Sequence, residues 1–517
     1  MRIRLASLLA DRKPLPSTNP FQISSDEIGF LRTCTPPESC SIGSLASFNV
    51  AETMSFMKDG RTGCKTERLY QCPPVLKSSN YKLLFAGFIG LLLFIYHYAS
   101  FWGNSNAAHD MFTKLLAATG CVASLSHASC PHPPALRMNH VQVVGTHNSY
   151  HREVSLNERA VFEQIMPAPE NLYYSHASLE DQLSHQAVRS LEIDLHSDTK
   201  GGLYSDPLIW RLSNLTNATA PFYDPNFFKP GLKVFHVTDA DVNAVCHTFV
   251  ECLQQLKHWS DNNPTHLPIL IDLELKCDAP YCAFGGLCAE EAVNWTLPRI
   301  LEVDREIRSV MPSNQLVTPD DVRQTNMTLE QSVLQHGWPK LDDVRGRFMF
   351  FFDNDPDNDS ACTAIRSIYR SNGHESLQDR VVFTNSVEGD SDAAFIKYNN
   401  PTKGGLAEIQ RLVRKGYIVR TRADTPITTL LEKELSMYNA SWPSGAQIVS
   451  TDWPAYGMSA RYGWDYVVKI GDRRVARCNP VNAPEACDES QLEPLQLDSR
   501  THLSVKKLAS VRHRRSP

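Results

Sequence analysis

Residues that could do chemistry gather at four points of the sequence, each at the end of a short apolar run. The four segments are 145–150 (GTHNSY), 192–196 (EIDLH), 235–236 (FH) and 272–276 (DLELK). Two histidines, His147 and His236, suit the cleavage of a phosphodiester. One can stabilise the pentavalent phosphorus while the other protonates the leaving oxygen, and a metal ion can hold the phosphate.

The acidic residues of these segments predict a metal site. Side chains alternate along a strand, so Glu192 and Asp194 share one face of their strand. Asp272, Glu274 and Lys276 share one face of another strand for the same reason. Buried carboxylates are unfavourable unless a cation pairs with them. Carboxylates together with an Asn amide suit Ca²⁺ or Mg²⁺ better than Zn²⁺.

Eight short apolar and β-branched runs predict the strands that position these residues. The runs are 141–145, 189–195, 232–237, 268–275, 347–353, 380–384, 416–421 and 446–451, and helical patterns lie between them, for example at 241–259, 289–310, 361–372 and 405–415. Alternating strands and helices indicate parallel βαβ units, and eight such strands predict an α/β fold, the (β/α)8 or TIM barrel. All four segments would then lie at the catalytic, carboxyl-terminal face. A doubly wound sheet is the alternative, but no G-x-G-x-x-G turn follows the first strand.

The composition is that of a globular protein, since 42% of the 517 residues are hydrophobic and 21% are charged. The net charge of −6 provides no basic field for nucleic acid, so we expect no nucleic-acid partner. Residues 1–80 are rich in Ser, Pro and Thr and predict a disordered segment or an over-extended gene model. Residues 491–517 predict a disordered basic tail, and the barrel is expected to span 138–475.

Two segments predict export of the barrel. Residues 83–102 contain no Asp, Glu, Lys or Arg and are long enough for a transmembrane helix, with basic residues on the side that stays in the cytosol. Residues 111–129 have the charged start, apolar stretch and small-residue end of a secretory signal peptide. Either the protein is membrane-anchored through the first segment, or translation starts at Met111 and the protein is secreted. Both alternatives place the catalytic domain outside the cytosol.

Sequons and cysteines agree with export. Six N-x-S/T sequons lie downstream of both segments and predict a glycoprotein; they are at Asn214, Asn217, Asn294, Asn326, Asn358 and Asn439. In an oxidising compartment we expect disulfides that involve Cys277, Cys282 and Cys288, and a further one between Cys478 and Cys487.

Several motifs resemble, in order and spacing, one known family. GTHNSY at 145–150, LEID at 191–194, VFH at 234–236 and LIDLELK at 270–276 are similar to the calcium-dependent phosphatidylinositol-specific phospholipase C-like phosphodiesterases. VRTRAD at 419–424 and STDWP at 450–454 resemble the extracellular, single-barrel branch of that superfamily. The resemblance covers about residues 138–470, which is nearly the whole predicted barrel.

The resemblance implies a mechanism and a set of roles. It implies that His147 stabilises the transition state and that His236 is the general acid. It favours Ca²⁺ over Mg²⁺ and implies these ligands: Asn148, Glu192, Asp194 and Glu274. In that family the inositol 2-hydroxyl attacks phosphorus and gives a cyclic inositol phosphate and diacylglycerol, and here Glu192 or Glu274 could be the base.

Two basic residues are expected to bind the substrate, a phospholipid or inositol phosphodiester at a membrane surface. Lys276 lies at the end of the segment 272–276, and Arg422 lies just past a predicted strand end. Arginine can pair with a phosphate oxygen in bidentate geometry. The alternative for Arg422 is an internal salt bridge to Asp424 or Asp452.

Two other functions remain open from the sequence. A glycerophosphodiester phosphodiesterase or a sphingomyelinase D-like enzyme also uses a Glu-x-Asp metal site and two histidines. Their second histidine follows the first by about a dozen residues, whereas His236 lies far from His147. A catalytically silent barrel that binds a surface is the third hypothesis, but no histidine or carboxylate of the expected site is missing.

Overall fold

The computed structural model describes residues 135–166, 168–277, 282–283, 287–288, 290, 293–356, 364–471 and 474–493. All of these residues belong to one of the two compact units of the chain, Val122–Pro517. The predicted segments 1–80, 83–102 and 111–129 lie outside the described residues. Within the described part of the chain, no helix has the length and apolar character needed to cross a membrane.

The described residues form a barrel of parallel strands. The strands are β1 (Val141–Thr146), β2 (Val188–Leu195), β3 (Ile269–Leu275), β6 (Phe348–Phe352), β7 (Phe383–Thr384), β8 (Phe395–Lys397), β9 (Ile418–Arg422) and β10 (Ile448–Thr451). They pair in the order β7-β6-β3-β2-β1-β10-β9-β8, and an isolated parallel bridge between Asn385 and Phe395 joins the two ends. This is the predicted TIM barrel. A ninth strand, β11 (Ala476–Cys478), pairs antiparallel with the start of β1.

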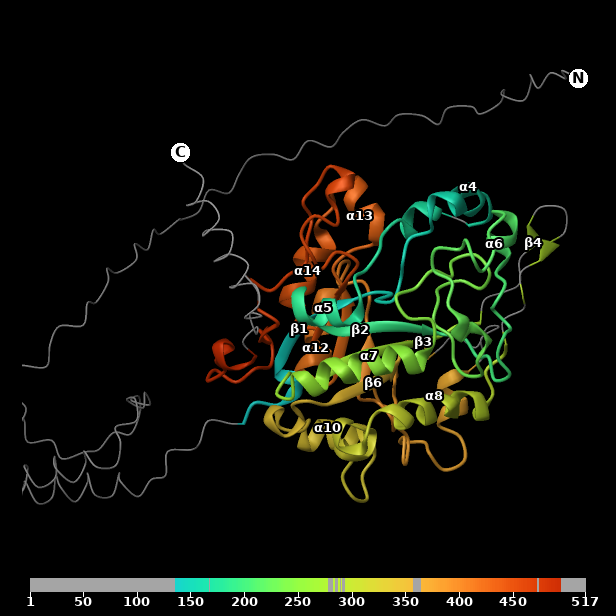
Figure 1. Cartoon of the computed structure of the whole chain (residues 1–517). Coiled ribbons are helices and arrows are strands. Elements are labelled where there is room, and N and C mark those ends of the chain that lie inside the picture. The colour runs from blue at the N-terminus through green and yellow to red at the C-terminus, as the bar shows by residue number, and fades with distance from the viewer. Residues whose placement is uncertain are drawn as a thin grey trace, which may run out of the picture. The chain divides into compact units, whose positions relative to one another are not determined.

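Helices cover the outside of the barrel, and Figure 1 shows α7 alongside β2 and β3. The α-helices are α4 (Leu156–Ile165), α5 (Leu179–His185), α6 (Leu208–Leu212), α7 (Phe249–Asn262), α8 (Leu297–Val310), α9 (Pro319–Val322), α10 (Leu329–His336), α11 (Ile365–Tyr369), α12 (Gly405–Lys415), α13 (Pro426–Glu432) and α14 (Ser436–Ser444). The short 3₁₀ helices are η1 (Met138–His140), η2 (Pro169–Leu172), η3 (Pro225–Phe228), η5 (Ser313–Gln315), η6 (Leu341–Val344), η7 (Ala460–Tyr462) and η8 (Glu489–Gln491). A small hairpin pairs β4 (Cys282–Ala283) with β5 (Leu287–Cys288).

Two helices show how well local signals set the helix ends. The prediction for 405–415 matches α12, which lies between Gly404 and Gly416, both with positive φ. The helix predicted at 241–259 was placed too early at its start, because α7 begins only at Phe249. Its N-cap is Thr248, whose side chain accepts a hydrogen bond from the amide of Glu251.

The predicted third strand was wrong. Residues 232–237 lie in the connection between β2 and α7 and form only isolated bridges, such as that between Lys233 and His196. Leu232, Val234 and Phe235 are buried, so the apolar pattern is real. The segment, however, bonds to the extension of β2 and to the residues before α7 rather than to a neighbouring barrel strand. The barrel strand that the sequence missed is β8, whose three residues are too few to show a period of two.

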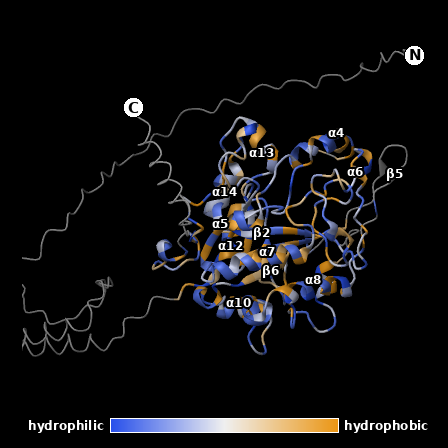
Figure 2. Cartoon of the chain, in the orientation of Figure 1, coloured by the Kyte–Doolittle hydropathy of each residue, from blue (hydrophilic) through white to orange (hydrophobic). Residues whose placement is uncertain are grey.

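The apolar core lies between the strands and the helices. On β2, Leu191, Ile193 and Leu195 belong to the main core cluster, whereas Glu192 and Asp194 point to the other face. Figure 2 shows the hydrophobic residues around β2, β6 and α7. The interior of the barrel is therefore free to carry charged side chains. Leu492 is buried and Glu493 pairs with Arg189, so the first residues of the predicted tail 491–517 pack against the barrel, and residues 494–517 lie outside the described residues.

Candidate active site

His147 lies directly after β1, and a buried aspartate orients its ring. Nδ1 lies 3.0 Å from Oδ1 of Asp452, at the end of β10, and Nε2 lies 3.8 Å from Oε1 of Glu192. Because an ionised carboxylate only accepts hydrogen bonds, Nδ1 donates and Nε2 faces the interior of the site. Burial and the positive charge of Arg422 lower the pKa of His147 to about 3, although Asp452 opposes this shift. The ring of His147 is therefore neutral near pH 7.

His236 repeats this arrangement on a separate loop. Its Nδ1 lies 3.0 Å from Oδ2 of Asp241, a fully buried carboxylate, while a fifth of the His236 side chain is exposed. Burial alone would raise the pKa of Asp241, but His151 and His236 together hold it well below its usual range. As an anion, Asp241 fixes the hydrogen on Nδ1 of His236. Nε2 of His236 makes no hydrogen bond to any of the described residues, so it can meet a ligand.

Three carboxylates from neighbouring strands converge between these elements. Glu192, Asp194 and Glu274 each offer one oxygen, and these oxygens lie within 4.8 Å of one another. The register places Asp194 directly beside Glu274 on β2 and β3. Burial raises the pKa of Glu192 to about 7 and that of Asp194 well above its usual range. Arg420 lowers the pKa of Glu192 and Lys276 lowers that of Asp194, but these cations do not offset the burial of the cluster.

The donor atoms around this cluster fit a hard cation. Both oxygens of Asp194, and both the oxygen and the nitrogen of the Asn148 amide, are buried without a hydrogen-bond partner among the described residues. Asn148 has a φ of +45°, which turns the chain sharply after β1. The next residue, Ser149, ties this turn to β2, since its hydroxyl accepts a hydrogen bond from the amide of Glu192 at 2.8 Å. Ca²⁺ takes carboxylate and amide oxygens as ligands, and these oxygens accept no hydrogen bond from the described residues.

The two predicted substrate-binding cations lie at the edges of the site and already have partners. Nζ of Lys276 lies 3.5 Å from Asp194 and 3.3 Å from Glu274. Arg422 lies 3.1 Å from Oδ2 of Asp452 and donates to the carbonyl oxygen of Asp424 at 3.1 Å. The salt bridge that the sequence offered as the alternative role of Arg422 is therefore present.

Sequence reasoning missed Arg420, the central cation of the site. Its guanidinium is fully buried inside the barrel and pairs with Glu192, with Asp272 at 3.3 Å and with Asp353 at 3.4 Å. Lys397 on β8 adds a second cation, 2.9 Å from Asp353. The available signal was an arginine in the middle of the predicted strand 416–421, between Val419 and Thr421. Sequence reasoning also missed Asp241 and Asp452, the two aspartates that orient the histidines.

Comparison with known proteins decides the family. The family model described as "Phosphoinositide phospholipase C, Ca2+-dependent" matches residues 136–480. The chain belongs to this family. The predicted resemblance is thus confirmed, and with it the expected cofactor, since the family depends on Ca²⁺ and the acidic triad could hold a metal ion. This is a family of phosphoric diester hydrolases that act on phosphoinositides, and it is a different family from that of the sphingomyelinase D-like alternative.

Solved structures with similar folds come from bacteria. A calcium-dependent phosphoinositol-specific phospholipase C from a Pseudomonas species is 17% identical, and the match covers 62% of this chain and 92% of that one with a TM-score of 0.37. A Ca²⁺-dependent phosphatidylinositol-specific phospholipase C from Streptomyces antibioticus is also 17% identical, with 62% and 96% covered and a TM-score of 0.39. A phosphatidylinositol-specific phospholipase C from Listeria monocytogenes is 12% identical, with 64% and 95% covered and a TM-score of 0.35. A search of curated proteins found no match.

Proposed function

We propose that this enzyme is exported and cleaves an inositol phosphodiester lipid, of the phosphatidylinositol or glycosylphosphatidylinositol type, by attack of the inositol 2-hydroxyl on phosphorus. One observation carries the proposal. His147 and His236 come from separate loops, and each is held through Nδ1 by a buried aspartate. Each ring therefore offers Nε2 to the substrate. The reaction needs two such groups, one to stabilise the charge on the phosphoryl oxygens and one to protonate the leaving oxygen.

The two histidines would divide the reaction. As the oxygen of the 2-hydroxyl bonds to phosphorus, negative charge grows on the phosphoryl oxygens and His147 stabilises it. The negative phosphate raises the proton affinity of His147, so its Nε2 takes a proton from solvent when the substrate binds and donates it in a hydrogen bond to a phosphoryl oxygen, while Asp452 keeps the ring aligned. His236 gives its Nε2 proton to the glycerol oxygen as the bond from phosphorus to that oxygen breaks. The products are a cyclic inositol phosphate and diacylglycerol.

The carboxylate cluster would hold the calcium ion. We propose Asn148, Glu192, Asp194 and Glu274 as its ligands, on the unpartnered buried atoms and the close oxygens described above. When bound, Ca²⁺ would neutralise the substrate phosphate and make the 2-hydroxyl more acidic. Glu192 or Glu274 would take the proton of that hydroxyl. Lys276 and Arg422, at the edge of the cluster, would contact anionic groups of the substrate.

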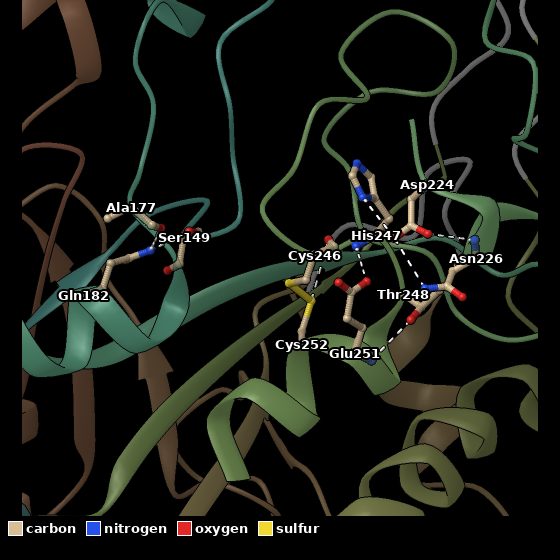
Figure 3. Close-up of a disulfide and its surroundings, with 10 residues drawn as sticks. All are labelled: Ser149, Ala177, Gln182, Asp224, Asn226, Cys246, His247, Thr248, Glu251 and Cys252. Atoms are coloured by element: carbon tan, nitrogen blue, oxygen red, sulfur yellow. Dashed lines mark hydrogen bonds and ion pairs between the residues drawn. A yellow bond between two sulfur atoms is a disulfide. The ribbon is translucent and has the colours of Figure 1, made fainter. Parts of the chain in front are cut away.

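Covalent and surface features support export. Figure 3 shows the disulfide between Cys246 and Cys252, which ties the loop before α7 to the first turn of that helix. A second disulfide joins Cys478 to Cys487, as predicted, and Cys277 is also disulfide-bonded. Disulfides persist in oxidising compartments. The described sequon asparagines are all exposed, as glycosylation requires; they are Asn214, Asn217, Asn294, Asn326 and Asn439.

A panel of lipid headgroups, assayed with Ca²⁺ and with a chelator, tests the class of substrate. We expect release of a cyclic inositol phosphate from inositol lipids, lost on chelation, and no turnover of choline lipids. Hydrolysis of choline lipids at a similar rate, or activity unaffected by the chelator, would contradict the proposal.

The leaving group tests the roles of the histidines. A nitrophenyl ester needs no proton donor, so His236→Ala should recover most of its lost activity on an inositol phosphate nitrophenyl ester. His147→Ala should stay impaired by about 100-fold or more on both substrates, because phosphorane charge develops whichever group leaves. Equal rescue of both variants would show that the roles are assigned wrongly.

A further inference from the structure

Behind the general acid lies a third histidine, His151, in the loop that follows β1. Its side chain is buried, and Nε2 contacts both oxygens of Asp241 at 3.0 and 3.2 Å. On the opposite side of the ring, Nδ1 lies 3.1 Å from the carbonyl oxygen of Tyr174. Asp241 thus lies between two imidazoles, that of His151 and that of His236, whose ring centroids are 6.1 Å apart.

The partners of His151 determine its protonation. A backbone carbonyl oxygen can only accept a hydrogen bond, so Nδ1 must carry a hydrogen. The ionised carboxylate of Asp241 also only accepts, so Nε2 must carry one as well. A ring with hydrogen on both nitrogens is an imidazolium. Burial lowers the pKa of His151, but the charge and hydrogen bond of Asp241, together with the charge of Asp452 and the bond to the carbonyl oxygen of Tyr174, raise it above its usual value, which agrees with this assignment.

We propose that His151 is a permanently protonated positioning residue that neutralises Asp241 and so keeps His236 ready to release its proton. This inference rests on the role of His236 as general acid. An uncompensated Asp241 would hold the His236 proton too tightly, because a full negative charge would lie at hydrogen-bond distance from its ring. The His151 cation cancels most of the negative charge of Asp241, and the Asp241 carboxylate can still orient His236 through its hydrogen bond.

Among the residues that the structure describes, no other ionic group near this pair can replace the charge of His151. Tyr174 packs against its ring, with centroids 4.7 Å apart, and Tyr150 lies close to Asp241; burial raises the pKa of both phenols far above 10, so both are neutral. Asp452 acts on His151 from the end of β10, but its charge is negative and it pairs with His147 and Arg422. The cation that balances Asp241 is therefore His151.

The backbone already holds His236 in place, so the electrostatic effect of His151 can be tested apart from any effect on the position of His236. The amide of His236 donates to the carbonyl oxygen of Asp241 at 3.0 Å. The amide of Asp241 donates to the carbonyl oxygen of Val237 at 3.0 Å. Substitution of His151 should therefore change the charge on Asp241 more than the position of His236.

The first experiment records ¹⁵N spectra of the full chain with labelled histidines, assigned by single substitutions. We expect both ring nitrogens of His151 to stay protonated between about pH 5 and 8, where ordinary histidines titrate. A non-protonated nitrogen of His151 at about pH 7 would overturn the inference, whatever the activity of the enzyme.

The second experiment compares three variants. In His151→Gln, which keeps a donor but removes the charge, the titration midpoint of His236 and the alkaline limb of kcat/KM should both move up by about one pH unit. In His151→Lys, which restores a cation, both should return toward the wild-type position. His266→Gln is the matched control, since His266 is equally buried and bonds Ser260 and Leu267 away from the site. It should alter stability without moving either midpoint.

Two results would count against the inference: His151→Gln and His266→Gln giving the same His236 midpoint, or His151→Lys behaving like His151→Gln. The titration midpoint of His236 is read from the spectra and needs no turnover. Activity that persists in His236→Ala would therefore contradict the proposed function. The titration midpoints of His236 in the wild type and in the His151 variants would still decide the role of His151.

Discussion

Arg420 makes a sharp prediction because one guanidinium serves three buried acids. Replacement by methionine, which has a similar shape and no charge, leaves Glu192, Asp272 and Asp353 facing one another across the barrel. Lys397 still pairs with Asp353, but no other described cation pairs with Glu192 or Asp272. Arg420→Met should therefore destabilise the fold strongly, and the loss should depend on pH.

The size of the effect follows from burial. Removing one partner of a buried ion pair costs about 3–5 kcal/mol, and here the side chain that is lost is 1% exposed. Burial already raises the pKa of Glu192 to about 7, and the loss of Arg420 raises the pKa further. A folded pKa above the unfolded one means that stability falls as pH rises through that window. We expect a loss of about 4 kcal/mol near pH 8 and about 1–2 kcal/mol near pH 5, where Glu192 and Asp272, whose pKa values are raised, are protonated.

Urea unfolding at both pH values, with a chelator present, measures these losses. Arg461→Met is the matched control, because Arg461 pairs in bidentate geometry with Glu153 but is 45% exposed. An exposed pair contributes about 0–1 kcal/mol, and the control should show no change with pH. A loss in Arg420→Met no larger than that of the control, or equal at both pH values, would refute the reasoning that Arg420 compensates buried charge.

Three further predictions concern other parts of the molecule. Wild type should gain thermal stability with Ca²⁺ by mass action, and Asp194→Asn should lose most of that gain; equal shifts in both would argue against Asp194 as a ligand. Arg422→Lys should raise KM at nearly constant kcat, whereas a lower melting temperature with unchanged KM would leave only its salt bridge to Asp452. Burial raises the pKa of Glu306 on α8 from the usual 4.5 to about 7. Between pH 4.5 and about pH 7 the folded state keeps a proton on Glu306 that the unfolded state has lost, so the free energy of unfolding falls as pH rises. Glu306→Gln should remove a decline of about 3 kcal/mol from urea-unfolding profiles, and an unchanged profile would exclude this group as the cause.

The sequence could predict those parts of the site that local rules control. Alternation along a strand is enough to put Glu192 and Asp194 on one face, and the register of β2 and β3 then brings Asp194 beside Glu274. The same local logic set both ends of α12, where a glycine precedes and follows the helix. It failed at 232–237, because a buried apolar segment shows strand-like alternation whether or not a neighbouring strand accepts its hydrogen bonds.

The sequence by itself therefore determined the barrel, the family motifs and the residues that we propose to carry the chemistry. Only the tertiary structure decided which groups tune that chemistry. Asp452 orients His147 across 305 residues of chain, and Arg420 reaches Glu192 across 228. For Arg420 the local sequence shows only an arginine inside a predicted strand, and for Asp452 it shows nothing that distinguishes the residue from a solvated aspartate. Their roles arise because barrel closure brings β9 and β10 against β1, where burial makes each charge depend on its neighbours.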